Sequence, residues 1–268
     1  MQTVIIAETV AQSFPQLPTI NPDVLAVGSE QQIEARMVAN AHAQIEFTRE
    51  YLRRMNAPKF PTFDTAPQFL AWVIERGTKV LQLEEGREFT LDGENLEVYQ
   101  NLASYFTGDY QIWPCSLDRR KGLLIFGRYG CGKSLMMRLF GQNPRQSFRI
   151  VSSRAIAEDY RLNNDMAPHK AAIPNYSSSK FFGHSVLGLC IDDMGAESER
   201  SNYGNVSNVI AEIIQDRYDI PALRGPMTHI VTNATPKQLR KAYGERVYDR
   251  LRGLFNIVEF PEDATSRR

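Results

Sequence analysis

The stretch Gly122-Leu-Leu-Ile-Phe-Gly-Arg-Tyr-Gly-Cys-Gly-Lys-Ser-Leu-Met-Met-Arg-Leu-Phe140 decides the fold. Its first five residues form a short apolar run followed by glycine, which is typical of a buried parallel strand. Residues 127–134 then satisfy the pattern G-x-x-x-x-G-K-S/T without mismatch,. Residues 135–140 continue as a helix. A strand, a glycine-rich loop and a helix in this order predict a phosphate-binding loop.

The chemistry of this loop follows from its residue types. Glycines let the backbone curl so that successive N–H groups point at phosphate oxygens, and the positive end of the helix adds to the same field. Lys133 would neutralise the β- and γ-phosphates, and the Ser134 hydroxyl would ligate Mg²⁺. We therefore expect ATP and Mg²⁺ as cofactors. The predicted ATP-binding residues are Gly127, Arg128, Tyr129, Gly130, Cys131, Gly132, Lys133, Ser134 and Leu135.

Two other interpretations of the loop are less favoured. A glycine-rich turn that happens to contain Lys-Ser would not need a strand before it and a helix after it. A redox role for Cys131 is weakened because Cys131 occupies a variable position of the loop pattern.

An acidic pair follows a second apolar run, residues 186–191. Asp192 and Asp193 come directly after this run in the form of a Walker B element, and Asp192 lies 59 residues beyond Lys133. We expect Asp192 to hold Mg²⁺ through water and Asp193 to polarise the water that attacks the γ-phosphate. The alternative is a pair of acids solvated in a turn, and the hydrophobic strand before them makes that interpretation weaker.

The rest of the chain alternates in the same way. Further apolar runs at 148–151, 229–232 and 257–260 are separated by helical patterns at 206–218 and 236–243. This alternation predicts an α/β fold with a parallel sheet covered on both faces. Before residue 88 the patterns are helical: one helix starts at Ser29 and stops near 56–58, and a second runs from Thr65 to Gly77,. We expect a helical region over 1–88 and an α/β domain over 89–268.

Composition limits the class of protein. Lys+Arg and Asp+Glu are each 31 of 268 residues, so a chain whose whole surface binds nucleic acid by charge is excluded,. Three cysteines without C-x-x-C spacing argue against a disulfide scaffold or a zinc site,. The first residues lack the basic region of a signal peptide, and no run reaches the roughly 18–20 apolar residues of a membrane span,. We expect a cytoplasmic protein with no membrane partner.

The sequence Asp192-Asp-Met-Gly-Ala-Glu197 resembles AAA+ ATPases of the DnaC/IstB type, which comprise bacterial and phage replicative helicase loaders and transposition helper ATPases. Other stretches are similar to this family in ordered spacing, with 41 residues from Asp192 to Asn233 and 13 from Asn233 to Arg246. The resemblance covers roughly 90–268. The similar stretches are 128–134 (phosphate loop), 213–218 (helix end), 232–235 (sensor 1), 243–251 (arginine-finger box) and 266–268.

The resemblance implies an AAA+ P-loop NTPase core with a five-stranded parallel sheet and a short or absent lid. Nucleotide would lie between neighbouring subunits, so the chain would self-associate through the ATP site. Asn233 would position the attacking water, and Arg246 would reach into the adjacent subunit's site. A solvated helix face, with Arg246 and Arg250 paired to Glu245 and Asp249, stays open as an alternative.

The same resemblance implies a replicative helicase loader, a weak and switch-like ATPase that binds single-stranded DNA and a hexameric helicase. A transposition helper that contacts a transposase, and a structural adaptor that binds ATP with little hydrolysis, remain open. Residues 1–88 would bind the partner, although Arg49, Arg53 and Arg54 fit a solvated helix edge better. A set of cations interleaved with aromatic residues suits binding of single-stranded DNA, because the cations can contact the DNA backbone and the aromatics can stack on bases. An ordinary surface loop is almost as good an interpretation of these residues. These residues are Arg154, Tyr160, Arg161, Lys170, Tyr176 and Lys180.

Overall fold

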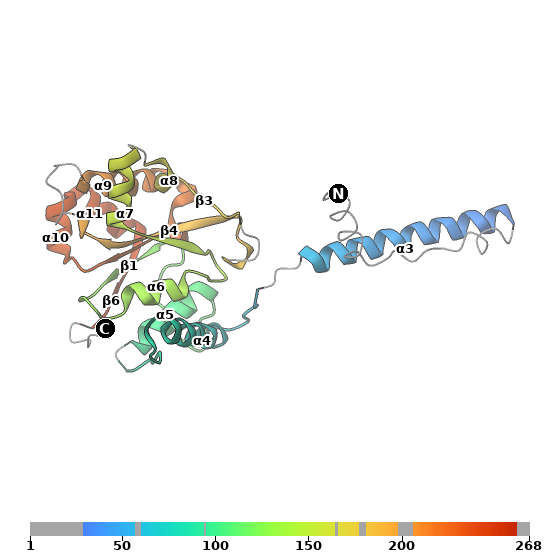
Figure 1. The fold of residues 1–268 in the computed structure, drawn as a ribbon, viewed down its shortest axis with the longest axis horizontal. Coiled ribbons are helices and arrows are strands. Elements are labelled where there is room, and N and C mark those ends of the chain that lie inside the picture. Colours follow the sequence, from blue (N-terminus) through green and yellow to red (C-terminus); the bar gives the residue numbers. More distant parts are fainter. Residues whose placement is uncertain are drawn as a thin grey trace, which may run out of the picture. The chain divides into compact units, whose positions relative to one another are not determined.

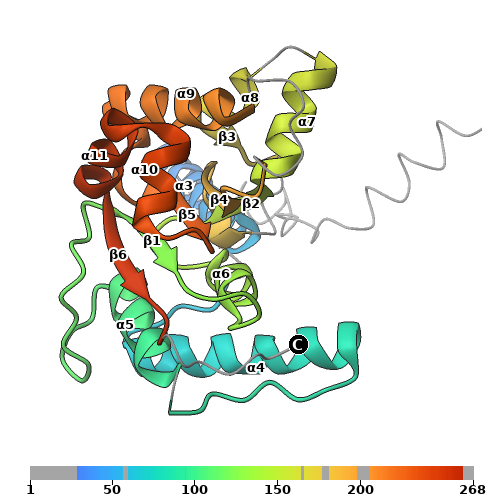
Figure 2. The ribbon, with the colours of Figure 1, turned by 90° about the vertical axis from the view of Figure 1, so that its left-hand side faces the viewer.

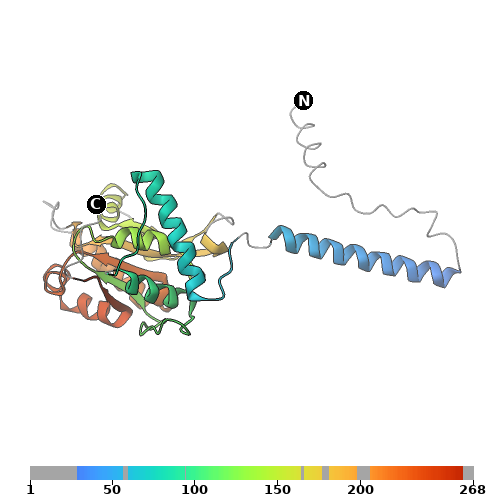
Figure 3. The same cartoon turned by 90° about the horizontal axis from the view of Figure 1, so that it is seen from below.

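The computed structural model describes residues 29–56, 60–93, 95–163, 166–176, 181–197 and 206–261, and the chain forms two compact units, residues 1–57 and 58–268. In the first unit the described residues form one long helix, α3 (Glu30–Asn56) (Figure 3). Its start agrees with the prediction, since the Ser29 amide donates to the Gln32 side chain (3.1 Å). Arg49 pairs with Glu46 on the same helix (2.9 Å), and the side chains of Arg53 and Arg54 lie outside the described residues.

The second unit is built on a parallel sheet with the strand order β2-β4-β5-β1-β6. The five predicted strands are confirmed: β1 (Gly122–Phe126), β2 (Phe148–Ser152), β4 (Val186–Met194), β5 (Thr228–Thr232) and β6 (Phe255–Glu259). One short addition is β3 (Ile173–Pro174), which pairs antiparallel with the start of β4. Strand β5 lies between the strand that precedes the phosphate loop and the strand that ends in the acidic pair. The carboxyl ends of these three strands therefore meet at one edge.

Helices cover both faces of the sheet (Figures 1 and 2). One face carries α4 (Ala66–Glu85), α5 (Leu96–Thr107) and α6 (Lys133–Phe140). The other carries α7 (Ser153–Asn163), α8 (Ala167–Lys170), α9 (Val206–Asp219), α10 (Pro236–Tyr243) and α11 (Glu245–Leu254). Alternate residues of β1 face the two layers, since Leu123 lies in the first core and Leu124 in the second,. This is the α/β arrangement that the sequence predicts, with a mostly parallel sheet between two layers of helices.

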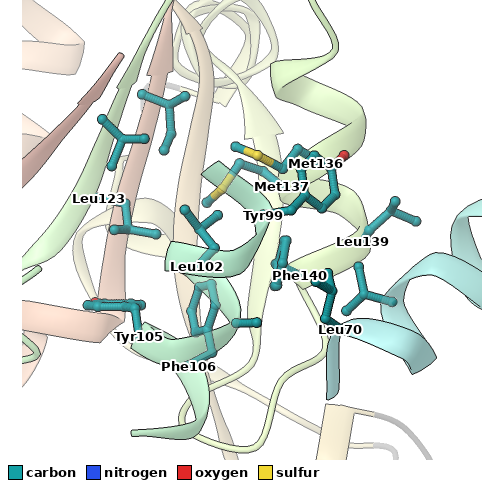
Figure 4. Close-up of a cluster of buried hydrophobic side chains, with 14 of the residues drawn as sticks. Leu70, Tyr99, Leu102, Tyr105, Phe106, Leu123, Met136, Met137, Leu139 and Phe140 are labelled. Carbon is teal, nitrogen blue, oxygen red and sulfur yellow. The ribbon is translucent and has the colours of Figure 1, made fainter. Parts of the chain in front are cut away.

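Helix α4 belongs to the compact unit of the sheet, which differs from the predicted boundary near residue 88. Its apolar side chains Phe69, Leu70 and Val73 are buried in one core with α5 and α6. Figure 4 shows Leu70 with labelled side chains of α5 and α6. The Phe69 and Phe140 rings meet edge to face at 5.8 Å. An exposed apolar helix face would be costly, so α4 folds onto the sheet layer.

The sequence predicts that this helix ends at Gly77, and that prediction is wrong. Helix α4 continues to Glu85 and ends at Gly86, whose φ of 68° is a left-handed cap,. A Cβ atom on Gly77 would lie 2.7 Å from the Phe89 ring. Glycine at this position therefore allows the segment after α4 to fold back closely against the helix.

Candidate functional site

The predicted phosphate loop connects β1 to α6 at the carboxyl edge of the sheet. Gly130 and Gly132 have φ values of 83° and 95°, in the left-handed region that favours glycine,. Gly132 is also the N-cap of α6, so the loop curls directly into the positive end of a helix,. The sequence pattern thus forms the local geometry that its residue types predict.

Lys133 lies at the centre of this loop and is only 4% exposed. Its Nζ donates to the carbonyl oxygens of Gly127 (2.9 Å) and Arg128 (2.7 Å). A third bond goes to Oδ1 of Asn233 (2.6 Å), which follows β5. A buried ammonium group needs such partners, and here it links the loop to the neighbouring strand.

Ser134, at the start of α6, meets Asp192, near the end of β4. The Ser134 hydroxyl donates to Oδ1 of Asp192 at 2.9 Å. Burial raises the pKa of Asp192, the bond from Ser134 opposes this, and the charge of Asp193 adds to it,. A hydroxyl and a carboxylate are hard oxygen donors of the kind that Mg²⁺ prefers, so the pair fits the predicted metal. Within the described ranges, no three His, Cys, Asp or Glu side chains converge as a metal cluster.

Asp193 lies in a β-bulge that the sequence did not reveal. The β4–β5 pairing passes from Ile191 opposite Ile230 to Met194 opposite Thr232, so β4 has one extra residue,. Asp193 has a φ of 53°, which is uncommon for a residue other than glycine,. Such bulges re-aim a side chain, and here Oδ1 of Asp193 accepts a bond from Nδ2 of Asn233 (2.8 Å).

Asn233 joins Lys133 to Asp193. Its amide oxygen accepts from Lys133 and its amide nitrogen donates to Asp193, so both ends of the side chain are used. Three predicted site residues from three different elements therefore form one hydrogen-bonded chain. The structure brings Lys133, Ser134, Asp192, Asp193 and Asn233 to a single place.

A cavity of about 310 Å³ opens at this place. Its phosphate-loop wall comprises residues 129–135, together with Asp193 and Asn233. The opposite wall was missed, because no sequence motif marks it and because it depends on how α4, α5 and the segment between them fold onto the sheet layer. That wall includes Leu81, Phe89, Thr90, Asn95 and Tyr99, from α4, α5 and the segment between them. It offers apolar and aromatic surface with amide and hydroxyl groups, which suits a base and a ribose.

Tyr129, at the tip of the phosphate loop, is 67% exposed and borders two cavities. The second cavity has about 420 Å³ and shares Tyr129, Asp193 and Asn233 with the first. Its remaining lining comes from residues 194–196, from Ala234 and from α10. Asp193 is therefore accessible from two sides.

The two arginines of the finger box are placed differently. Arg246 is exposed on α11 and lines neither cavity, so it is not brought together with Asp193 of its own chain. It forms no ion pair with any residue that the structure describes, and Glu245 pairs with Arg240 instead (3.7 Å). Arg250 is mostly buried, pairs with Asp219 (3.6 Å) and lies over the Tyr218 ring at 4.8 Å. Arg250 thus ties α11 to α9.

We use the term strip for the cations and aromatics expected to contact single-stranded DNA: Arg154, Tyr160, Arg161, Lys170, Tyr176 and Lys180. Arg154 is exposed, and the other described cations of the strip are neutralised. Arg161 pairs with Glu158 (2.5 Å) and Lys170 with Asp216 (2.7 Å). Tyr160 packs against the second core, and Lys180 lies outside the described residues. Tyr176 is 94% exposed. The described part of the strip therefore shows one free aromatic surface but no gathered positive charge.

No protein-family model matches the chain, and no curated protein matches it. Among solved structures, it is similar to a crystal structure of the DnaC helicase loader. The TM-score is 0.44 and the identity 14%, covering 65% of this chain and 93% of that one. Over the described residues, no helix has both the length and the apolar character needed to cross a membrane.

Proposed function

We propose that residues 58–268 bind Mg·ATP and hydrolyse it slowly. The observation that carries this proposal is the chain Lys133–Asn233–Asp193, which lies beside the Ser134–Asp192 pair at the end of parallel strands. Ligands of open α/β sheets bind at the carboxyl ends of the strands, in the crevice formed there. The cavity at this edge has room and suitable walls on both sides.

Each residue has a defined part in this proposal. The amides of the phosphate loop and Lys133 would bind the phosphates, and Lys133 would exchange its bond to Asn233 for one to a phosphate oxygen. Ser134 and Asp192 would hold Mg²⁺, which supplies positive charge to the phosphate oxygens when bound. Asp193 would accept the proton of the attacking water, and Asn233 would orient that water.

We further propose that nucleotide state controls contacts with a second copy of the chain, with a replicative helicase and with single-stranded DNA. The motif resemblance at 192–197, 232–235 and 243–251 supports this role. The exposed position of Arg246 on α11 suits a group that completes the site of a neighbouring copy. Hydrolysis would then act as a switch.

Phosphate release by the full chain tests the proposal, with and without single-stranded DNA. We expect slow Mg²⁺-dependent release that changes when DNA is added. Capture of a replicative helicase or of a transposase by the immobilised full chain identifies the partner. We expect the chain to retain the helicase in the presence of ATP. Binding of ATP without any release would favour the structural adaptor, and retention of the transposase alone would favour the transposition helper.

A further inference from the structure

Glu197 is a buried carboxylate that the proposed chemistry does not use. It is 2% exposed and lines neither cavity, although it ends the motif that begins with Asp192. Burial raises the pKa of Glu197, and the hydrogen bond from the Gly195 N–H and the nearby charge of Arg154 oppose this shift. A buried carboxylate is expensive unless its oxygens are hydrogen-bonded, so its partners indicate what it does.

Both oxygens of Glu197 are used, and they face different elements. Oε2 accepts the backbone N–H of Gly195 (3.0 Å), in the turn that follows the β4 bulge. Oε1 accepts the hydroxyl of Tyr243, the last residue of α10. The Ser153 hydroxyl, at the start of α7, donates to the backbone carbonyl of Asp193 (2.8 Å) and so holds the same turn to α7.

These contacts connect the two parts of the proposed hydrolytic machinery. The turn at 193–197 carries Asp193, whose left-handed backbone needs support from its surroundings,. Helix α10 passes through Gly244 into α11, which begins at Glu245 and carries Arg246. A single carboxylate therefore joins the element that holds Asp193 to the helix pair that holds Arg246.

We propose that Glu197 is a positioning residue: its carboxylate clamps the Asp193 turn to the end of α10 and so sets the place of Asp193 relative to α11. This inference rests on the proposed function, because positioning matters only if Asp193 acts on bound nucleotide. The clamp leaves Lys133 and Ser134 untouched, so it affects turnover and not nucleotide affinity.

Glu197→Gln and Tyr243→Phe test the clamp, each in the full chain. We expect ATP affinity by calorimetry to stay within about twofold, while kcat falls by about tenfold, as expected for one lost hydrogen bond to a charged group. The double variant should be no slower than Glu197→Gln alone, because both changes break the same contact. Amide hydrogen exchange over residues 193–197 should be faster in both single variants.

Tyr105→Phe is the matched control. It removes the hydroxyl of another buried tyrosine, which donates to the Lys121 carbonyl (2.6 Å) before β1, and it should change neither kcat nor exchange at 193–197. An equal loss of kcat in Tyr105→Phe, or unchanged exchange at 193–197 in Tyr243→Phe, would overturn the clamp. If Glu197→Gln does not fold, Tyr243→Phe carries the test. A parent chain without turnover contradicts the proposed function, and the exchange measurement then still decides on the clamp.

Discussion

Asp193 is the residue on which the proposed chemistry depends most directly. Its carboxylate borders both cavities and is held by Asn233. Asp193→Asn keeps the size of the side chain and can still accept the bond from Asn233, but it cannot take a proton from water. We expect ATP to bind normally while kcat falls by about 10²–10⁴-fold, the usual effect of a lost acid–base group.

Steady-state phosphate release and calorimetry measure the two quantities separately. Asp64→Asn, which changes an exposed carboxylate that lines neither cavity, is the control and should be neutral. If Asp193→Asn turns over ATP at the parent rate, Asp193 is not the group that polarises the attacking water.

At the scale of elements, the β4 bulge is the feature that places Asp193. Gly195 follows the bulge with a φ of 99°, and an added Cβ atom would lie 3.3 Å from the Cβ of Ala234. A left-handed conformation costs a residue with a side chain about 1–2 kcal/mol. Gly195→Ala should therefore lower the free energy of unfolding by about that amount, measured by urea denaturation.

Gly253→Ala is the matched control for this substitution. Gly253 lies in α11 with open space around its Cβ position, so alanine should be neutral or stabilise by up to about 1 kcal/mol through helix propensity,. Equal effects of the two substitutions would show that the turn at Gly195 is not strained by a side chain.

Helix α11 provides the second prediction at this scale. If Arg246 completes the site of a neighbouring copy, Arg246→Ala should bind ATP normally and hydrolyse it poorly, since arginine fingers contribute up to roughly 10³–10⁵ in rate. A mixture of Arg246→Ala with Lys133→Ala should recover activity, because one variant supplies an intact phosphate loop and the other an intact finger. Mixed assemblies that form by light scattering yet show no recovery would leave Arg246 as a solvated surface residue.

The residues of the site that could be predicted from sequence are those whose place follows from their immediate neighbours in the chain. Lys133 and Ser134 follow from the loop pattern. Asp192 follows from its place after an apolar strand, and the carboxyl ends of parallel strands meet at one edge. The five strands were predictable for the same reason, because buried parallel strands are continuous apolar runs.

The remaining features depend on pairings between distant segments. The bulge at Asp193 exists only relative to the register of β5, which no local pattern encodes. The wall around Phe89 and Tyr99 depends on α4 folding onto the sheet layer. Gly77 suggested a helix end, whereas its real constraint is the Phe89 ring, twelve residues further along the chain.

At the scale of the whole molecule, acid should destabilise the compact unit through His229. Burial lowers the pKa of His229 to about 3, with further lowering by Arg145 and Arg217. Its Nδ1 accepts the Leu123 amide (3.1 Å), so the folded protein keeps this imidazole neutral. The unfolded chain takes up a proton below about pH 6.5, so stability is lost as the pH falls, by about 2 kcal/mol at pH 5.

The free energy of unfolding between pH 7.5 and 5 measures this effect. His229→Asn retains an oxygen that can accept the Leu123 amide but does not titrate, so its stability should depend less steeply on pH than that of the parent. His42→Asn changes an exposed histidine of α3 and should leave the parent slope unchanged. A parent slope retained in His229→Asn would assign the acid sensitivity to other groups.

The most direct test of the account is the stabilisation of the whole chain by Mg·ATP, compared between the parent and Lys133→Ala. A ligand at about a hundredfold its dissociation constant stabilises a protein by about 2.7 kcal/mol, which raises Tm by about 5–10 °C in a unit of this size. Thermal unfolding with and without Mg·ATP gives this shift for each variant, with the exposed Lys79→Ala as control. The account predicts the full shift in the parent and in Lys79→Ala, and a shift near zero in a folded Lys133→Ala. No shift in the parent, or an equal shift in Lys133→Ala, would contradict nucleotide binding at this loop.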